Sequence, residues 1–287
     1  MQPGRLIGEV EVEPDADGSV TSPAAGGVTG LDTSTVTAKV LALLAAFTPA
    51  APELTLSELS RKAGVSLPTA HRRAAELVAW GAMERTADGR YRIGLRLWEI
   101  AALAPRAHGL REAALPFLED LYVVTRQNVQ LAVREGLELV FVERIAGRGA
   151  VPVMTRVGGR FTLHATGVGL VLLANAPAEV QEAVLASPLP RYTDRTITDP
   201  ATLRPVLAAV RSQGYAMSDR LVTSDALSVA APVLGRTGDV QAAVSLVVTA
   251  TDDAPVRALV NAVRTAARGI SRAIGYADPR PIQSFTG

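Results

Sequence analysis

The sequence predicts a multidomain protein in which an all-α winged helix-turn-helix domain precedes an α+β domain with a largely antiparallel sheet. Two patterns predict the first domain: a capped amphipathic helix over about residues 66–80, and a tight-turn signal, Asp88-Gly89, between two short strands just after it. From residue 111 onward, runs of strands separated by helices predict the second domain. With 287 residues, 48% of them hydrophobic and 20% charged, the chain is long enough to form both cores.

Two helices are predicted before the capped helix. In the first, apolar residues recur at helical spacing from Val36 to Phe47, and Pro49 ends the pattern. The second opens at Thr55-Leu-Ser-Glu58, a capping box in which the two end residues satisfy backbone amides at the helix start. It ends near Gly64, and a short turn leads directly into the capped helix. Helix-turn-helix is therefore the economical interpretation.

The capped helix carries a signal at each end. Ser66 can accept a hydrogen bond from a first-turn amide, Pro68 is tolerated in the first turn, and Gly81 is typical of a helix stop. An apolar stripe faces one way, and polar groups lie opposite it: the stripe is Ala70, Ala74, Leu77 and Val78, and the polar groups are Thr69, Arg72 and Glu76, with Arg73 beside them. One face is predicted to pack inward and the other to offer hydrogen-bond donors.

The hairpin over 83–93 is predicted to be a wing. Side chains alternate across a strand, so Arg90 and Arg92 point away from the side that carries Tyr91 and Ile93. Taken alone, the hairpin is explained equally well as an ordinary solvated turn with paired arginines. The three helices before it favour the wing.

Charge is distributed unevenly along the chain, although the net charge is only +1. Residues 34–97 carry nine Lys/Arg and five Asp/Glu, a net of +4, which makes them the nucleic-acid candidate. Residues 1–33 carry one Arg and six acids, a net of −5, and too few large apolar side chains to form a core, so we expect a disordered acidic tail.

Compartment is indicated by what the sequence lacks. It has no cysteine, and its N-terminus has no signal-peptide pattern. The longest apolar run, Leu41 to Phe47, is far shorter than the about 20 residues that span a bilayer. We expect a cytoplasmic protein with no membrane partner.

The second half begins with an apolar segment, interrupted at Pro105, that predicts a linker helix over 96–112 which also pairs protomers. The elements expected beyond it are a helix over 111–126, strands over 128–134, 138–145 and about 150–156, helices over about 164–174, 177–186 and 200–213, strands over 214–220, 226–234 and 240–249, and a helix over about 255–275. This order indicates an α+β domain over 113–276 and a tail over 277–287.

Several segments resemble one family in the same order and at the same separations. They are residues 56–64, Thr69 with His71-Arg72, and residues 88–94 in the first domain, and Gly158 to Gly169, Gly214-Tyr-Ala216, Ser228-Val-Ala-Ala-Pro-Val233 and Ala242-Ala-Val-Ser245 in the second. Together they resemble the IclR family of bacterial transcriptional regulators over about residues 34–276. The resemblance implies a homodimer or tetramer, a dimer of dimers, with a winged helix (34–95), a linker helix (96–112) and a GAF-like C-terminal domain that binds a small organic effector.

The first domain is expected to bind double-stranded operator DNA. The capped helix would enter the major groove, the wing would grip the flanking backbone, and serines near helix starts would orient phosphates. The residues expected at this interface are Thr69, His71, Arg72 and Arg73 on the helix, Arg90 and Arg92 on the wing, and Ser57 and Ser66. The family usually has a Lys-Ser pair where this chain has Leu67-Pro68.

The resemblance also implies where the effector binds. The free amides of Gly167 and Val168 at a helix start would hold a carboxylate, and Ser218, Ser228, Ser245 and Val247 would line the pocket from three strands. Charged or polar residues usual in the family are replaced by Leu170, Leu221 and Leu234-Gly235. These departures imply an atypical effector. Ser218 and Val247 also stand where the family has acidic or polar residues, so we expect an effector, a carboxylate or an aromatic compound, that is larger or more apolar than a small keto acid.

No cofactor, metal or catalytic residue is expected. His164 has no other histidine at a metal-ligand spacing, so a structural imidazole is favoured over a zinc ligand. Ser228 and Ser245 lack a nucleophile elbow, and Gly167-Val-Gly169 lacks the third glycine of a dinucleotide loop. The function predicted is a ligand-controlled transcriptional regulator, with repression as the default. The alternative is an enzymatic or ligand-binding C-terminal domain whose winged helix makes protein contacts.

Overall fold

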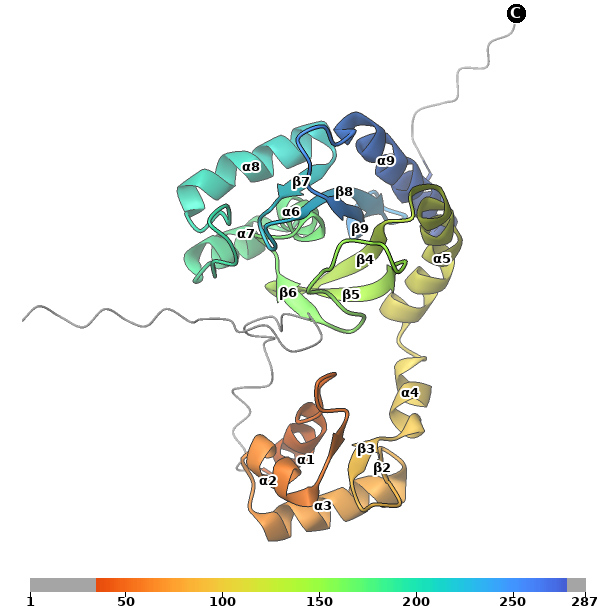
Figure 1. The fold of residues 1–287 in the computed structure, drawn as a ribbon, viewed down its shortest axis with the longest axis vertical. Coiled ribbons are helices and arrows are strands. Elements are labelled where there is room, and N and C mark those ends of the chain that lie inside the picture. The colour runs from red at the N-terminus through yellow and green to blue at the C-terminus, as the bar shows by residue number, and fades with distance from the viewer. Residues whose placement is uncertain (1–34, 278–287) are drawn as a thin grey trace, which may run out of the picture. The chain divides into compact units, whose positions relative to one another are not determined.

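The structure is a computed structural model that describes residues 35–277 of the chain. It divides between His108 and Gly109 into two compact units (Figure 1). The predicted acidic tail, 1–33, lies outside the described residues, as does the C-terminal tail after residue 277. In the described part, we find no helix with the length and apolar character needed to cross a bilayer.

The N-terminal unit is a winged helix-turn-helix. Its elements are α1 (Val36–Ala45), β1 (Glu53–Leu54), α2 (Leu56–Ala63), α3 (Leu67–Trp80), β2 (Met83–Arg85), β3 (Tyr91–Ile93) and α4 (Leu95–Ala101). The strands form an antiparallel sheet in the order β1-β3-β2, so β3 is central. All three helices and the hairpin that the sequence predicts are confirmed.

Helix ends in this unit follow the predicted residues with one exception. The capping box of α2 is present: Glu58 Oε2 accepts from the Thr55 amide at 2.8 Å, and the Glu58 amide donates to Thr55 Oγ1 at 3.3 Å. Gly81 ends α3 with φ 88°, a left-handed conformation that favours glycine. Ser66 precedes α3, but its hydroxyl donates to Thr69 Oγ1 at 2.9 Å, so the predicted side-chain cap is wrong.

One apolar core holds the N-terminal unit together. The predicted stripe of α3 supplies Ala70, Ala74 and Leu77 to it, and the small side chains let α1 and α2 pack closely. Tyr91 of the central strand is also buried here. This core fixes which face of α3 is left for solvent.

The predicted linker helix over 96–112 is instead two helices. The first, α4, ends at Ala101, and α5 (Pro105–Thr125) begins at the proline. Pro105 lacks an amide hydrogen and fits a first turn, so it starts a helix here. The helix predicted over 111–126 is therefore the continuation of α5.

The C-terminal unit contains one antiparallel sheet between two groups of helices. Its strands are β4 (Asn128–Glu135), β5 (Glu138–Ile145), β6 (Arg160–Thr162), β7 (Ala216–Asp219), β8 (Ala226–Leu234) and β9 (Val240–Thr249), in the spatial order β6-β5-β4-β9-β8-β7. Its remaining helices are α6 (Gly167–Ala174), α7 (Ala178–Ala186), α8 (Pro200–Gln213) and α9 (Val256–Ala273).

The two faces of this sheet have separate apolar cores. One core lies under α6, α7 and α8, and the other lies under α5 and α9 (Figure 1). The central strands β4, β8 and β9 contribute to both cores because their residues alternate between the faces. This arrangement confirms the predicted α+β domain.

The strand predicted over about 150–156 is wrong. That segment is irregular, and the third strand of the sheet is β6, further along the chain. Pro152 has no amide hydrogen to give a ladder. Instead, the side chain of Asn128 donates to the Val151 carbonyl at 2.6 Å. Side-chain hydrogen bonds, rather than backbone pairing, attach this segment to the sheet, and its residues line the pocket described below.

Candidate nucleic-acid interface and ligand pocket

Helix α3 presents Arg72 to solvent on the face opposite its buried stripe, and the neighbouring His71 is also exposed. Among residues 35–277, Arg72 has no carboxylate partner, so its full charge is available to an external anion. Thr69 is half-buried, and its hydroxyl accepts from Ser66. Ser57, at the start of α2, is exposed. The predicted residues on α2 and α3 therefore reach solvent to different degrees.

Arg73 differs from its neighbour Arg72. Its side chain is 14% exposed, and its Nη1 donates to Glu76 Oε1 at 2.7 Å. The pair joins residues three apart on one helix, where side chains meet readily. A phosphate or base would have to compete with Glu76 for this guanidinium, so Arg72 is the better candidate for a direct contact.

The wing arginines are paired with acids inside the domain. Arg92 lies between Glu53 on β1 and Glu84 on β2, with Nη2 2.8 Å from Glu84 Oε2 and Nη1 3.9 Å from Glu53 Oε1. The hydrogen bond from Arg92 to Glu84, and the charge of that carboxylate, raise the pKa of Arg92. Its environment is thus net acidic, which disfavours a phosphate. For Arg92, the structure therefore agrees with the alternative interpretation of the hairpin, in which its arginines pair with acidic side chains of the domain.

Arg90, nearer the tip of the wing, is held less tightly. Its Nε lies 3.3 Å from Asp88 Oδ2, and its Nη1 lies 3.9 Å from Glu58 Oε2. Hydrogen bonds from the Thr55 amide and hydroxyl lower the pKa of Glu58, with a smaller contribution from Arg90. Arg90 thereby links the wing to the start of α2 but remains partly exposed.

Arg85 is a candidate that the sequence did not single out. It is exposed on β2, and its guanidinium carbon lies 5.8 Å from the centroid of the Tyr91 ring. Among the described residues it has no acidic partner. Its position in the sequence, just before the predicted turn of the hairpin, was the feature that could have identified it. Arg85 therefore offers the wing a positive charge that no described acidic side chain pairs with, whereas Arg92 is paired.

The C-terminal unit contains a pocket on the face of the sheet that α6 covers. It encloses about 410 Å³ of empty space, including solvent at its open mouth. Apolar and uncharged polar side chains line it: Gln130, Val153, Met154, Thr155, Thr166, Ser218, Val222, Thr223, Ala226, Ser228 and Val247. No ionisable side chain occurs among these described lining residues. The pocket therefore suits a largely apolar molecule with a few hydrogen-bonding groups.

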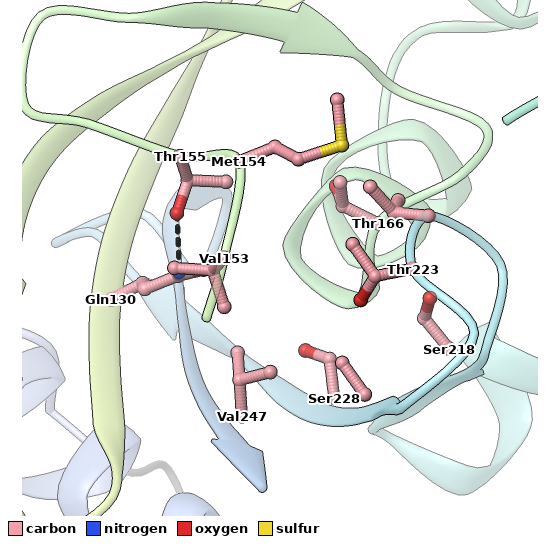
Figure 2. A pocket seen from close by; sticks show the side chains of 11 residues that line it. Gln130, Val153, Met154, Thr155, Thr166, Ser218, Thr223, Ser228 and Val247 are labelled. Carbon is pink, nitrogen blue, oxygen red and sulfur yellow. Dashed lines mark hydrogen bonds between the residues drawn. The ribbon is translucent and has the colours of Figure 1, made fainter. Parts of the chain in front are cut away.

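Three of the predicted effector residues lie in one row across the sheet. Ser218 of β7 is opposite Ser228 of β8, which is opposite Val247 of β9, and all three line the pocket. In Figure 2, Gln130, Val153 and Thr155 lie on one side of the pocket, and Thr166, Ser218 and Thr223 lie on the other. The sequence missed the threonines and Gln130. A polar residue within the apolar strand over 128–134 was the available signal.

Gly167 borders the pocket at the first turn of α6. A Cβ on it would stand 2.7 Å from Ser228 Oγ, which is too close unless the Ser228 side chain or β8 shifts. Thr166 precedes it, and the Thr166 hydroxyl accepts from the Gly169 amide at 3.0 Å. This bond leaves the amides of Gly167 and Val168 at the helix start for another acceptor.

Three predicted residues are absent from the pocket lining: Gly167, which only borders the pocket, Val168 and Ser245. Val168 is 1% exposed, and its side chain packs in the core under α6, so only its backbone amide could contact an effector. Ser245 is fully buried, and its hydroxyl donates to Gln130 Oε1 at 3.4 Å. Ser245 therefore supports a lining residue from behind.

His164 has the structural role that its isolation predicts. Its Nε2 lies 3.0 Å from the Pro190 carbonyl oxygen, and its ring stacks on Tyr192 at a centroid distance of 6.1 Å. Burial lowers its pKa, partly offset by the hydrogen bond with Pro190. The described residues contain no group of His, Cys, Asp or Glu side chains that could hold a metal ion.

A winged helix with an uncommitted arginine on α3, together with a second domain that contains a ligand pocket, defines a ligand-responsive DNA-binding transcriptional regulator. Residues 36–87 match the IclR helix-turn-helix domain, and residues 103–272 match the bacterial transcriptional regulator IclR C-terminal domain. The chain belongs to the IclR family.

Relatives of known sequence and structure support the same conclusion. The regulator XynR of Escherichia coli is 30% identical over 242 residues, 83% of this chain and 96% of its own length, and KipR of Bacillus subtilis is 33% identical over 229 residues, 78% of this chain and 91% of its own. An IclR homolog from Microbacterium hydrocarbonoxydans, crystallised with 4-hydroxybenzoate, is 38% identical with a TM-score of 0.80, covering 84% of this chain and 99% of that one. These relatives are regulators, which sets aside the enzymatic alternative.

Proposed function

We propose that this regulator is a repressor whose binding to operator DNA is controlled by a small aromatic carboxylate in the C-terminal pocket. The observation that carries the proposal is the pocket lining, in which hydroxyls and one amide interrupt an apolar wall and no side chain is charged. A ring fits against Val153, Met154 and Val247. The related homolog crystallised with 4-hydroxybenzoate supports the choice of compound.

The carboxylate of such an effector requires donors, because a buried charge without partners is costly. The amides of Gly167 and Val168 point from the start of α6, where the helix dipole also favours an anion. Ser228 Oγ lies beside Gly167, and at the far side of the pocket Gln130 and Thr155 offer partners for a phenolic hydroxyl. The effector would thus be held at both ends.

In DNA binding, α3 is the groove-reading helix. Arg72 and His71 make the direct contacts to DNA. Thr69 and Arg73 are half-buried and make secondary contacts, and Arg90 and Arg85 reach the flanking DNA backbone. Ser57 and Ser66 orient phosphates at two helix starts. Arg92 serves mainly to hold the wing together. We assign residues 34–95 to DNA binding, 96–112 to the linker and 113–276 to effector binding.

The assembly is a homodimer or a dimer of dimers, paired in part through α4. This helix has no buried residue, and its apolar side chains are open to solvent: Leu95 is 64% exposed, Trp98 is 60% exposed, and Leu103 just beyond it is 78% exposed. Several exposed large apolar side chains on one short segment are typical of an interface. A dimer also matches the palindromic sites that helix-turn-helix proteins read, in the cytoplasm where operator DNA lies.

The test is a gel shift with the DNA upstream of the protein's own gene. We expect a specific complex whose affinity falls steeply with salt, and release of the DNA when 4-hydroxybenzoate is added. A close analogue without the carboxylate, phenol, is the matched control and should not release it. Unchanged DNA binding at saturating 4-hydroxybenzoate would refute the proposed effector, and absence of any specific complex would refute the proposed operator.

A further inference from the structure

One wall of the pocket is attached to the sheet by two side chains of β4. Asn128 Nδ2 donates to the Val151 carbonyl at 2.6 Å, and Gln130 Nε2 donates to Thr155 Oγ1 at 2.6 Å (Figure 2). Between these two points the segment supplies Val153 and Met154 to the lining. Both β4 side chains are almost fully buried. An effector that moves this wall therefore also changes the lengths and angles of these hydrogen bonds.

The carboxamide of Asn128 has a second partner. Its Oδ1 accepts from Arg144 Nη2 at 2.9 Å and from Arg144 Nε at 3.3 Å. Arg144 lies on β5 directly opposite Gln130. Burial lowers the pKa of its guanidinium, and within residues 35–277 it has no ion pair. A partly desolvated cation held by one neutral amide responds strongly to any movement of that amide.

The residue before Arg144 reaches the other face of the sheet. Glu143 is 7% exposed, lies opposite Leu131 beside a register shift in the β4–β5 pairing, and accepts from the Arg144 amide through Oε1 at 2.8 Å. Its enclosed Oε2 lies 2.6 Å from Nε of Arg111 on α5, an ion pair whose angle is outside hydrogen-bond geometry. Adjacent residues of β5 therefore connect the pocket side to α5.

We propose that Asn128 and Arg144 are positioning residues that transmit effector occupancy from the pocket wall to α5 through Glu143 and Arg111. Arg111 lies near the start of α5, the helix that the chain enters from the winged-helix unit. A shift of residues 151–155 moves the Asn128 carboxamide, which moves the Arg144 guanidinium bonded to it. The β5 backbone at Arg144 then shifts and changes the position of Glu143. An effector biases this element only by binding its two arrangements unequally. The inference rests on the proposed effector role of the pocket.

Hydrogen exchange of the ligand-free full-length protein tests the connection without any effector. Asn128→Ala and Arg144→Met should each raise exchange at residues 109–115 of α5 by about two- to thirtyfold, the range expected for single-residue coupling. Gln130→Ala is the matched control, because it removes only the attachment at Thr155 and leaves the hydrogen bonds of Asn128 to Val151 and Arg144 in place. It should raise exchange at residues 151–155 only. Unchanged exchange at α5 in both Asn128→Ala and Arg144→Met would overturn the proposal.

Operator binding provides a second readout that a merely structural role would not move. In Arg144→Met, calorimetry should show 4-hydroxybenzoate binding near the wild-type affinity, while its effect on operator affinity falls at least severalfold. By reciprocity, operator DNA should then also lose its effect on effector affinity. Full retention of the effector response in this variant would overturn the proposal. If wild-type protein fails to bind 4-hydroxybenzoate, the proposed effector fails, and the exchange experiment still decides this inference.

Discussion

Within the described part of the chain, Arg92 is paired with acidic side chains and Arg72 is not. This difference predicts unequal losses of operator affinity for two substitutions that remove the same charge. Arg72 is exposed on α3 without an acidic partner among the described residues, whereas Arg92 lies between Glu53 and Glu84. Arg72→Ala should weaken operator binding by about 1–3 kcal/mol, roughly 5- to 150-fold. Arg92→Ala should weaken operator binding less than Arg72→Ala does, because Arg92 is held by Glu84 and makes no direct phosphate contact.

The assay is a fluorescence anisotropy titration of labelled operator DNA at several salt concentrations. A phosphate contact by Arg72 contributes about 0.9 to the slope of log affinity against log salt for each copy bound. A base contact instead relaxes specificity at one position of the site. Thermal unfolding of both variants provides the control for folding. Wild-type affinity for Arg72→Ala, combined with a large loss for Arg92→Ala, would refute the argument from ion pairing.

Three further predictions follow from packing and titration. Gly167→Ala should lower the free energy of unfolding by about 1–3 kcal/mol and weaken effector binding, measured by denaturant titration and calorimetry, because its Cβ would stand 2.7 Å from Ser228 Oγ. Trp98→Glu should dissociate the assembly in sedimentation velocity with little change in thermal unfolding, because this side chain is 60% exposed. Stability should fall as pH drops below 6.5, the ordinary His pKa, because burial depresses the pKa of His164 and the unfolded chain then binds the extra proton. His164→Gln should flatten this part of the profile.

Each of these has a result that contradicts it. Gly167→Ala with unchanged stability would mean that the Ser228 side chain or β8 shifts without loss of stability. An intact assembly in Trp98→Glu would place the interface elsewhere. A gain of stability as pH falls from 6.5 would contradict the depressed pKa of His164, because that shift contributes only a loss of stability in this range. An unaltered profile in His164→Gln would assign the loss to other groups.

The winged helix was predictable because its signals are local. The capping box at Thr55 and Glu58, the glycine stop at Gly81 and the tight turn at Gly89 each act within a few residues. Ion pairing is not local in this sense. Glu53 lies far from Arg92 in the chain, and only the strand order β1-β3-β2 brings them together. Alternation therefore predicted the face on which Arg92 lies but not its partners.

The pocket was predictable only in part, for a related reason. Ser218, Ser228 and Val247 come from strands whose pattern was clear, and they form one row. The segment over 150–156 has strand-like composition, so propensity alone assigns it to the sheet. Its actual attachment depends on the buried amides of Asn128 and Gln130, which become visible only when β4 is placed beside it. Leu170 and Leu221, which depart from the family pattern, lie in the core under α6.

The pocket draws its lining from residues as far apart in the chain as Gln130 and Val247, so it exists only while the whole sheet is folded. Any compound that fills it must therefore add its binding free energy to the cost of unfolding the C-terminal unit, about 2.7 kcal/mol at a concentration one hundred times its Kd. The melting temperature of the protein then becomes a detector of its own signal molecule. Metabolites can be screened one by one for a rise in that temperature before any operator is known.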